Sequence, residues 1–324
     1  MSGVVKTLDY RTTLVRPTNI IAIGKNLYVS DQSGWPEVKI FVITPEGVIK
    51  QYDCTSRNVS KNDLLLNNIC WFLNNASGML LSNDTLYIAD AISHKIFSLN
   101  RGGLRTHIAG PWSYQTGETD GMGTDALFNH PGSITAIGDT LYVADAYNNR
   151  IRKITPDGNV TTFAGSKAGY ADGVGTLARF SNPHGIVAVG KDLYVTDSLN
   201  NRIRKISPNG TVTTIAGSDE GNEDGGLTEA KFKFPTNITA IEDTLYVVDS
   251  GNRCIRKIDL GVKPTIENYS RKKTTLEELR TLPPMGIFPG GIEFQEAEKR
   301  FQIAQNNIRK TKKGRKTKKT RKHK

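Results

Sequence analysis

The densest group of ionisable side chains lies at the end of the sequence. Between Arg309 and Lys324 the chain carries many basic residues and no carboxylate. The whole chain has 43 Lys and Arg against 32 Asp and Glu, and residues 1–308 are formally neutral, so this segment carries the entire net charge of +11. It cannot bury a core, and we expect it to be disordered. Its basic residues are Arg309, Lys310, Lys312, Lys313, Arg315, Lys316, Lys318, Lys319, Arg321, Lys322 and Lys324.

This polybasic tail is the first candidate for binding chemistry. A flexible polycation binds nucleic acid through counterion release, with little sequence preference and a steep dependence on salt. Nuclear targeting and attraction to another anionic surface are competing uses, and a solubilising terminus without a partner is a further alternative. We attribute any affinity for nucleic acid first to this tail and only then to the rest of the chain.

Aspartates that recur at regular spacing are the second candidate. Five of them follow a Leu-Tyr-Val-Ala-like run and could in principle form a cation-binding ring. Their recurrence at one strand end favours a structural role, in which each accepts hydrogen bonds from the following turn or pairs with an arginine of the next strand. They are Asp31, Asp90, Asp145, Asp197 and Asp249.

The sequence contains no recognisable set of catalytic residues. Four histidines fall in the body of the chain, at positions 94, 107, 130 and 184; His130 and His184 flank Pro131 and Pro183, and we interpret these two as turn residues. The Asp-Gly-x-Gly loops lack the downstream glutamate of a calcium loop. No Ser-His-Asp order, phosphate loop or CxxC pair occurs. The sequence therefore predicts no catalytic residue, metal or cofactor, and favours a non-enzymatic protein.

The cysteines and the N-terminus bear on the compartment. Cys54, Cys70 and Cys254 are odd in number and lack zinc-site spacing, which suits a reducing environment. No run approaches the ~18 apolar residues of a membrane span. The first residues also lack the apolar region of a signal peptide. We expect an intracellular protein, cytoplasmic or nuclear.

An internal repeat indicates the elements that position these residues. The five aspartates are separated by 59, 55, 52 and 52 residues. A proline lies ten residues before the repeated leucine in four units, and an Asp-Gly turn and a phenylalanine each recur twice at a spacing of 52 residues. Registers this strict indicate a repeat architecture.

Each unit reads as four short strands separated by turn residues. In the third unit we predict strands over Gly132–Ile137, Thr140–Ala144, Arg150–Ile154 and Val160–Ala164. They are rich in Ile, Val, Thr and Tyr but do not alternate cleanly, as expected for small sheets that pack on both faces. Four strands per ~52 residues predict an all-β fold, a β-propeller with five clear blades.

The repeat also resembles a known family. The residues Pro131 to Phe180 contain Leu-Tyr-Val-Ala-Asp, Asn-Asn-Arg-Ile-Arg-Lys-Ile, Gly-x-Val-Thr-Thr-Phe-Ala-Gly and Asp-Gly-x-Gly-x-x-Ala-x-Phe, and resemble the NHL repeat. The resemblance covers about residues 15–260. It is near-complete in units three and four and eroded in units one and two, where Phe97 replaces the second arginine of unit two. The motif is specific for architecture and weak for function.

The resemblance leaves two other functions open. Metal-dependent propeller hydrolases and lyases bring Asp, Glu, Asn and His ligands to the ring axis, and certain NHL propellers bind single-stranded RNA on a positive face. The predicted innermost strands carry Asn, Ser and Thr but no carboxylate and no histidine, and a neutral body argues against a broad phosphate-binding face. These strands are Asn19–Ile23, Gly78–Ser82, Ser133–Ile137, Gly185–Val189 and Asn237–Ile241.

The number of blades stays open at this point. NHL propellers usually have six blades, and residues 289–310 resemble a decayed sixth unit whose outer strand Val4–Leu8 would supply. The spacing of Phe294, Ala297, Phe301 and Ala304 instead favours a helix, with a second short helix over Thr274–Leu282. We divide the chain into a propeller at 1–266, an extension at 267–308 and the tail at 309–324.

The leading hypothesis is a monomeric ring that acts as a scaffold for a protein or peptide partner. Units one and two depart from the repeat through an insertion at Ser33–Pro36 and a long apolar link between Asp53 and Asn75. Departures of this kind often mark a binding site. The candidate partner surface is Trp35, Leu64, Leu65, Trp71 and Phe72; the same apolar link could equally pack under the ring.

Overall fold

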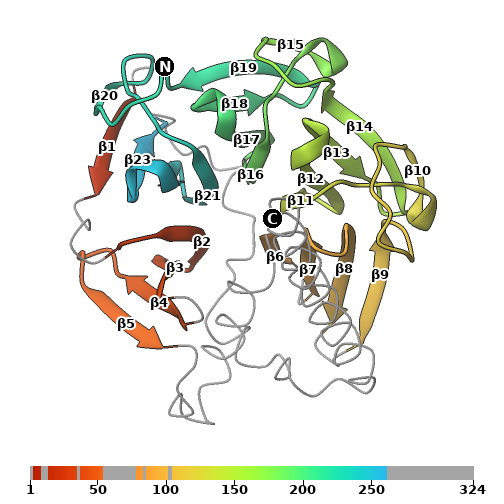
Figure 1. Cartoon of the computed structure of the whole chain (residues 1–324), viewed down its shortest axis with the longest axis horizontal. Helices are drawn as coiled ribbons and strands as arrows, with labels where there is room; N and C mark the ends of the chain where they lie inside the picture. The colour runs from red at the N-terminus through yellow and green to blue at the C-terminus, as the bar shows by residue number, and fades with distance from the viewer. Residues whose placement is uncertain are drawn as a thin grey trace, which may run out of the picture. The chain divides into compact units, whose positions relative to one another are not determined.

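The computed structural model describes residues 3–8, 14–34, 37–53, 78–82, 85–100 and 104–260. Strands in this part of the chain form five antiparallel sheets around a common axis, as Figure 1 shows. Each sheet is one blade, so the predicted β-propeller is confirmed and has five blades. No helix among the described residues has the length and apolar character to cross a membrane.

Blades one and two are four-stranded sheets. Blade one consists of β2 (Pro17–Ile23), β3 (Asn26–Gly34), β4 (Glu37–Ile43) and β5 (Ile49–Asp53). Blade two consists of β6 (Gly78–Ser82), β7 (Thr85–Asp90), β8 (Lys95–Asn100) and β9 (Arg105–Ala109). In both, the strands pair in chain order from the axis outward.

Blades three and four each have a fifth strand of two residues that the sequence did not predict. Blade three consists of β10 (Gly121–Met122), β11 (Pro131–Ile137), β12 (Thr140–Asp145), β13 (Arg150–Ile154) and β14 (Asn159–Gly165). Blade four consists of β15 (Gly173–Val174), β16 (Pro183–Val189), β17 (Asp192–Asp197), β18 (Arg202–Ile206) and β19 (Thr211–Ala216). The four strands predicted for unit three lie within one residue of those observed.

Blade five is assembled from both ends of the described chain. It consists of β20 (Gly225–Gly226), β1 (Val4–Leu8), β23 (Cys254–Asp259), β22 (Thr244–Asp249) and β21 (Pro235–Ile241). β1 pairs with β23 through Thr7 opposite Arg256, so it is the outer strand of the fifth blade and not of a sixth. The strand considered for a possible sixth blade is therefore present, and it belongs to blade five.

Short 3-10 turns follow the second long strand of blades three, four and five at one end of the ring: η2 (Ala146–Asn148), η4 (Ser198–Asn200) and η5 (Ser250–Asn252). Two more, η1 (Gly123–Asp125) and η3 (Gly175–Leu177), lie at the other end, where the N–H groups of Gly123 and Gly175 donate to the carbonyls of Gly158 and Gly210. This other end also carries tight turns such as Asp157-Gly158, where Gly158 has a φ of 88°, a left-handed conformation that glycine adopts without steric cost.

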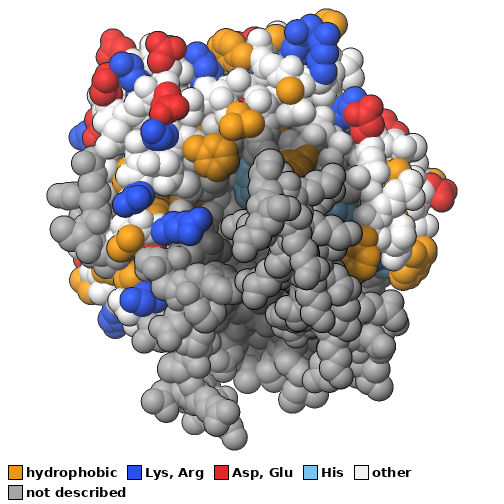
Figure 2. Space-filling model, in the orientation of Figure 1, with side chains coloured by type: hydrophobic (Ala, Val, Ile, Leu, Met, Phe, Trp, Pro, Cys, Tyr) orange, Lys and Arg blue, Asp and Glu red, His pale blue; other side chains and the backbone are white. Residues whose placement is uncertain are grey.

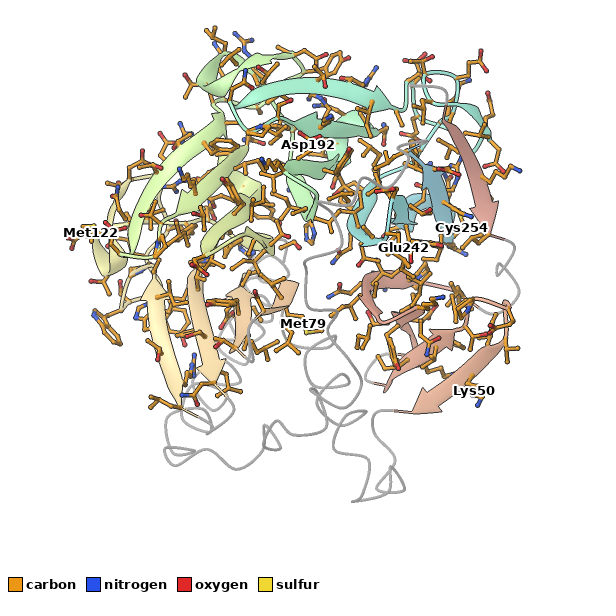
Figure 3. The ribbon with its side chains drawn as sticks, turned by 180° about the vertical axis from the view of Figure 1, so that it is seen from behind. Lys50, Met79, Met122, Asp192, Glu242 and Cys254 are labelled. Carbon is orange, nitrogen blue, oxygen red and sulfur yellow. The ribbon has the colours of Figure 1, made fainter. Side chains whose placement is uncertain are left out.

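The innermost strands, nearest the axis, are β2, β6, β11, β16 and β21. β11 contacts β6 and β16, and β21 contacts β16 and β2, so the innermost strands of neighbouring blades face one another. In Figure 3 Met79 of β6 lies near the centre of the ring, whereas Met122 of β10 lies at its outer edge.

The hydrophobic core lies between adjacent blades. One cluster joins Ala144 and Ile151 of blade three to Phe180 and Ile186 of blade four. Fully burying a side chain of this kind contributes roughly 1.5–3 kcal/mol. Both faces of a sheet are thus covered by its neighbours, which explains why the strands do not alternate between polar and apolar residues. Residues 261–324, with the predicted C-terminal helices and the polybasic tail, lie outside the described residues.

Candidate binding face around the ring axis

Arg152 on β13 of blade three is fully buried between two carboxylates. Its Nη1 donates to Asp145 at 3.0 Å and its Nη2 donates to Asp120 at 2.7 Å. The same nitrogens donate to the backbone carbonyls of Leu127 and Thr119. A buried guanidinium is tolerated only when it is paired and hydrogen-bonded, so this cluster fixes the loop before β11 against its blade.

Blades four and five repeat this cluster with the same atoms at 2.6 to 3.0 Å. In each of the three blades the guanidinium carbon lies 4.8 to 5.1 Å from the centroid of a buried phenylalanine ring. The predicted pairing of the repeated aspartates with an arginine is therefore confirmed in three blades. The repeated partners are Arg204 with Asp197, Asp172 and Phe180, and Arg256 with Asp249, Asp224 and Phe232.

In blades four and five the two carboxylates on the arginine differ in pKa. Burial raises the pKa of Asp145 to about 6, and burial also raises the pKa of Asp197 and of Asp249. Partial burial acts in the same direction on Asp172 and Asp224, but hydrogen bonds from a threonine and the arginine outweigh it and lower the pKa of both. In these two blades the outer carboxylate therefore keeps its charge to lower pH than the inner one.

Blades one and two lack the buried arginine. Phe41 lies opposite Val29 and Phe97 lies opposite Ile88, at the strand positions that arginine takes in the other blades. Asp90 of blade two instead accepts hydrogen bonds from the backbone N–H groups of the following turn, at 3.0 Å each. Both structural roles predicted for the repeated aspartates are thus present.

The repeated aspartates lie at the same end of every blade, and we call this side of the ring the aspartate face. Adjacent blades are joined there by a recurring hydrogen bond. The donor is the backbone N–H of the residue before the next blade's proline, and the acceptor is a side chain four positions after the aspartate. Asn182 donates to Oδ1 of Asn149 at 2.9 Å, and Phe234 donates to Oδ1 of Asn201 at 2.8 Å. Both asparagines have a φ near 55°, a conformation in which asparagine is enriched.

A histidine replaces asparagine between blades two and three. The backbone N–H of His130 donates to Nδ1 of His94 at 3.1 Å, and the two rings pack edge to face at 4.9 Å. His130 also stacks on Tyr147, with ring centroids 4.3 Å apart. Burial lowers the pKa of both histidines, so their imidazoles are neutral at neutral pH. The turn interpretation holds for His130, which lies in the bend before β11.

His184 corrects one expectation from the sequence. β16 begins at Pro183, two residues earlier than predicted, so an innermost strand does contain a histidine. Its Nδ1 lies 3.1 Å from the carbonyl oxygen of Thr236, and since a carbonyl can only accept, the nitrogen is the donor. His184 therefore connects the innermost strands of blades four and five. Burial lowers its pKa.

Other polar side chains on the innermost strands form hydrogen bonds to the innermost strand of a neighbouring blade. Asn237 donates to Asn19, Thr135 accepts the backbone N–H of Ala188, and Thr239 accepts that of Ala22. All four polar residues of these pairs are buried. Within the described ranges, no three His, Cys, Asp or Glu side chains are grouped so that they could share a metal ion.

Large apolar side chains are exposed at equivalent positions on the aspartate face. Ile92, Tyr147 and Leu199 each lie two residues after the repeated aspartate and are 67, 56 and 59% exposed. Phe234, before the proline of blade five, is 40% exposed. We call these four residues the rim. Figure 2 shows hydrophobic and histidine side chains near the middle of this face.

The rim was not predicted from the sequence, although a signal for it exists. Turns favour small polar residues, so a large apolar residue two positions after the aspartate in three successive units is unusual. The predicted partner surface of Trp35, Leu64, Leu65, Trp71 and Phe72 lies outside the described residues, as do all eleven basic residues of the tail. β5 ends and β6 begins on the aspartate face, so the chain between them leaves and returns there.

The basic strands offer little to an external ligand. Arg152, Arg204 and Arg256 are fully buried. The preceding arginines are also engaged: Arg150 pairs with Glu118, and Arg202 lies over the ring of Tyr170 at 4.3 Å. These contacts are structural in every case.

Comparison with known proteins agrees with this geometry. The NHL repeat matches residues 180–206, which run from the buried phenylalanine of blade four to the end of β18. The chain is 36% identical over 146 residues to Protein SUPPRESSOR OF QUENCHING 1, chloroplastic, of Arabidopsis thaliana, covering 41% of this chain and 14% of that protein. It is 32% identical over 139 residues to human NHL repeat-containing protein 2, covering 38% of this chain and 19% of that protein. This chain is an NHL-repeat β-propeller.

Solved structures show the same fold. The NHL-repeat propeller matches a protein of unknown function from Bacteroides thetaiotaomicron with a TM-score of 0.62 at 18% identity, over 80% of this chain and 76% of the other. It matches an auxiliary nutrient binding protein from Bacteroides ovatus with a TM-score of 0.53 at 17% identity, over 79 and 76%. The chain spans less than a fifth of the length of the two curated relatives named above.

Proposed function

We propose that this NHL-repeat propeller is a non-enzymatic binding module that holds a protein or peptide segment on its aspartate face. The observation that carries the proposal is the recurrence of Ile92, Tyr147 and Leu199 as exposed residues at one position of three successive blades. Exposed apolar side chains that gather on one surface mark interaction sites more often than scattered ones do. Partner binding would remove these side chains from water.

The backbone beneath the rim is rigid, which favours binding. The N–H of Tyr147 donates to the carbonyl of Asn129 at 3.1 Å, and the N–H of Leu199 donates to that of Ser181 at 3.0 Å. The aspartate two residues earlier is buried against an arginine in both blades. A surface that is already ordered loses little conformational entropy when it binds.

The test compares two double variants of the full chain. The rim variant carries Tyr147→Ser and Leu199→Ser. The control variant carries Val174→Ser and Leu177→Ser, which are 52 and 76% exposed at the outer edge of blade four. Proteins retained by the wild-type chain are identified, and their affinity for each variant is measured.

The proposal predicts that the rim variant loses affinity by about tenfold or more, as is common when a central apolar contact is truncated. The control variant should bind as the wild type does. If both variants retain every partner equally, the rim is not the binding surface and the proposal fails.

A second part of the proposal concerns the polybasic tail at 309–324. We propose that it attaches the ring to nucleic acid or another polyanion, while the ring selects the protein partner. The support is compositional: the whole net charge of +11 belongs to these residues. Replacing its lysines and arginines by glutamine should abolish binding to a single-stranded oligonucleotide and flatten the salt dependence. Retained affinity in that variant would instead favour RNA binding by the ring.

A further inference from the structure

The junction between blades five and one departs from the three other junctions that the structure describes. The position that accepts the next blade's N–H is His94, Asn149 or Asn201 in those three, but here it is Arg253, whose side chain has no acceptor. The backbone N–H of Arg16 donates instead to Oδ2 of Asp31 at 2.8 Å. The structural task of this position is thus performed by another residue, and the Arg253 side chain is not needed for it.

Arg253 also occupies an unfavourable backbone conformation. Its φ is 57°, in the left-handed region that Asn and Gly prefer and that costs other residues about 1 kcal/mol. Residues that do not suit their local backbone conformation are expected mainly at functional or strained sites. Arg253 is exposed, and in the described part of the chain its guanidinium donates no hydrogen bond and forms no ion pair.

Arg16 lies at the matching position of blade one. At the junctions into blades four and five the side chain four residues after the aspartate reaches the backbone of the residue before the next proline, and Arg253 and Arg16 hold these two positions at the junction of blades five and one. Arg16 is exposed too, and its side chain likewise has no partner among the described residues. Two neighbouring guanidiniums repel each other unless an anion lies between them. Figure 2 shows basic side chains over this junction, at the left of the view.

Blade five is also open next to this junction. The position two residues after its aspartate is Gly251, where the preceding three blades carry rim side chains. A Cβ there would lie 2.4 Å from Cγ of Lys233, so the Lys233 chain crosses this place, and its ammonium pairs with Glu220 at 2.7 Å. Phe234 is exposed beside it. An apolar ring and several cations therefore lie on one blade.

We propose that Arg16 and Arg253 form a carboxylate-binding site at the junction of blades five and one. It receives an acidic side chain of the partner segment, whose apolar residues contact Phe234 and the rest of the rim. This inference rests on the proposed function and specifies the partner as an acidic, apolar peptide. Guanidinium forks bind carboxylates through paired, charge-assisted hydrogen bonds.

A peptide fits this face better than a nucleic acid does. Single-stranded nucleic acid needs cations along its path and aromatic rings for successive bases. Ile92 and Leu199 on the rim are aliphatic, and Arg150 and Arg202 nearby are already engaged with Glu118 and Tyr170. Cations without partners are found at one end of the rim, which suits a segment with a localised negative charge.

The experiment probes an array of short synthetic peptides of random sequence with the full chain. The same array is probed with three variants: Arg16→Gln with Arg253→Asn, the rim variant, and Lys25→Gln with Lys191→Gln. The last pair removes two exposed cations from the turns at the opposite end of the blades. Every variant keeps the polybasic tail, so binding of acidic peptides to the tail is the same in all of them. Melting curves establish that each variant is folded.

We expect peptides that depend on the rim to contain Asp or Glu near apolar residues. Their affinity should fall about tenfold in the Arg16/Arg253 variant, and replacing their acid by its amide should have the same effect. The Lys25/Lys191 variant should bind as the wild type does.

Three results would overturn the proposal. Rim-dependent peptides without acidic residues, or unaffected by the arginine variant, would remove the carboxylate site and leave the binding face intact. Peptides insensitive to both the rim and the arginine variants would remove the proposed function as well. A single-stranded oligonucleotide that competes at the arginine pair more strongly than any peptide would show that the ligand class is wrong.

Discussion

Thr7 donates two hydrogen bonds to Asp224, from its backbone N–H and from its hydroxyl, both 2.8 Å long. The residues are 217 positions apart. Thr162 binds Asp120 with the same two groups, and Thr214 binds Asp172 in the same way. β1 therefore takes the place of the outer strand in blade five and holds the last blade to the segment that leads into the first.

Replacing Thr7 by Val should weaken this closure. The change keeps the shape of the side chain and removes the hydroxyl donor, which should cost about 1 kcal/mol in the free energy of unfolding. Thr213→Val makes the same change at an exposed position of β19 and should alter stability by less than about 0.5 kcal/mol. Urea unfolding of both variants measures the difference; equal effects would show that the contact with Asp224 contributes nothing specific.

The same contact should make the closure sensitive to acid. Although partial burial opposes it, bonds from Thr7 and Arg256 lower the pKa of Asp224 below 3.8. The unfolded chain therefore takes up this proton first, so the stabilisation is complete above about pH 3.8 and is lost as pH falls through the lowered pKa. Hydrogen exchange should show β1 amides losing protection there.

Asp145 should change the stability of the fold with pH in the opposite direction. Burial raises its pKa to about 6, so the folded protein takes up this proton first, and this group adds stability as pH falls from 6 toward 3.8. Loss of β1 protection already between pH 6 and 4 would contradict our assignment of acid sensitivity to Asp224.

His94→Asn should be tolerated and should reduce the dependence of stability on pH. Asparagine is the residue that the next two blades use for the same hydrogen bond and left-handed φ. Burial, and then the charge of His130, lower the pKa of His94 below 6.5; Asp90 raises it and Lys95 lowers it further.

For a lowered histidine pKa, the stabilisation is complete above about pH 6.5 and is lost as pH falls through the folded-state pKa. His94→Asn should remove this share of the loss while changing stability near pH 8 by less than about 0.5 kcal/mol. His94→Ala leaves the buried N–H of His130 without an acceptor and should cost about 1–3 kcal/mol. Thermal melts of the two variants across this pH range decide the matter, and an unchanged pH profile for His94→Asn would refute the assignment.

Arg253→Asn should stabilise the protein. It replaces an arginine at a left-handed φ by the residue found there in blades three and four, and we expect a gain of about 1 kcal/mol. The reverse change, Asn201→Arg, removes the acceptor for the N–H of Phe234 and should destabilise. A destabilised Arg253→Asn variant would show that the arginine has a structural role that the contacts do not reveal.

The sequence predicted the ring because its local signals agree with one another. The repeated Leu-Tyr-Val-Ala-Asp run, the Asp-Gly turns and the spacing of the buried phenylalanines all specify one blade. It also predicted that the aspartates pair with arginines, because both recur in register. The two-residue strands such as Gly121–Met122 were missed since two residues carry no periodicity.

Relationships between blades were harder to predict because they join residues that only the folded ring brings together. Val5-Lys6-Thr7 matches Val160-Thr161-Thr162, so the sequence holds a signal for the place of β1, but the strand had been considered only as part of a possible sixth blade. His94 in the place of asparagine became recognisable only through its bond to His130. The rim could be recognised only once the exposure of its side chains was known, because apolar residues at the same positions of the sequence could equally belong to a core.

Hydrogen exchange of the full chain, with and without a protein that it retains, tests most directly whether the aspartate face binds the partner. We predict added protection in the turns over residues 90–95, 145–149 and 197–201, and unchanged exchange at the opposite turns around Asp139 and Lys191. Protection confined to those opposite turns, with the aspartate face unaffected, would contradict the account.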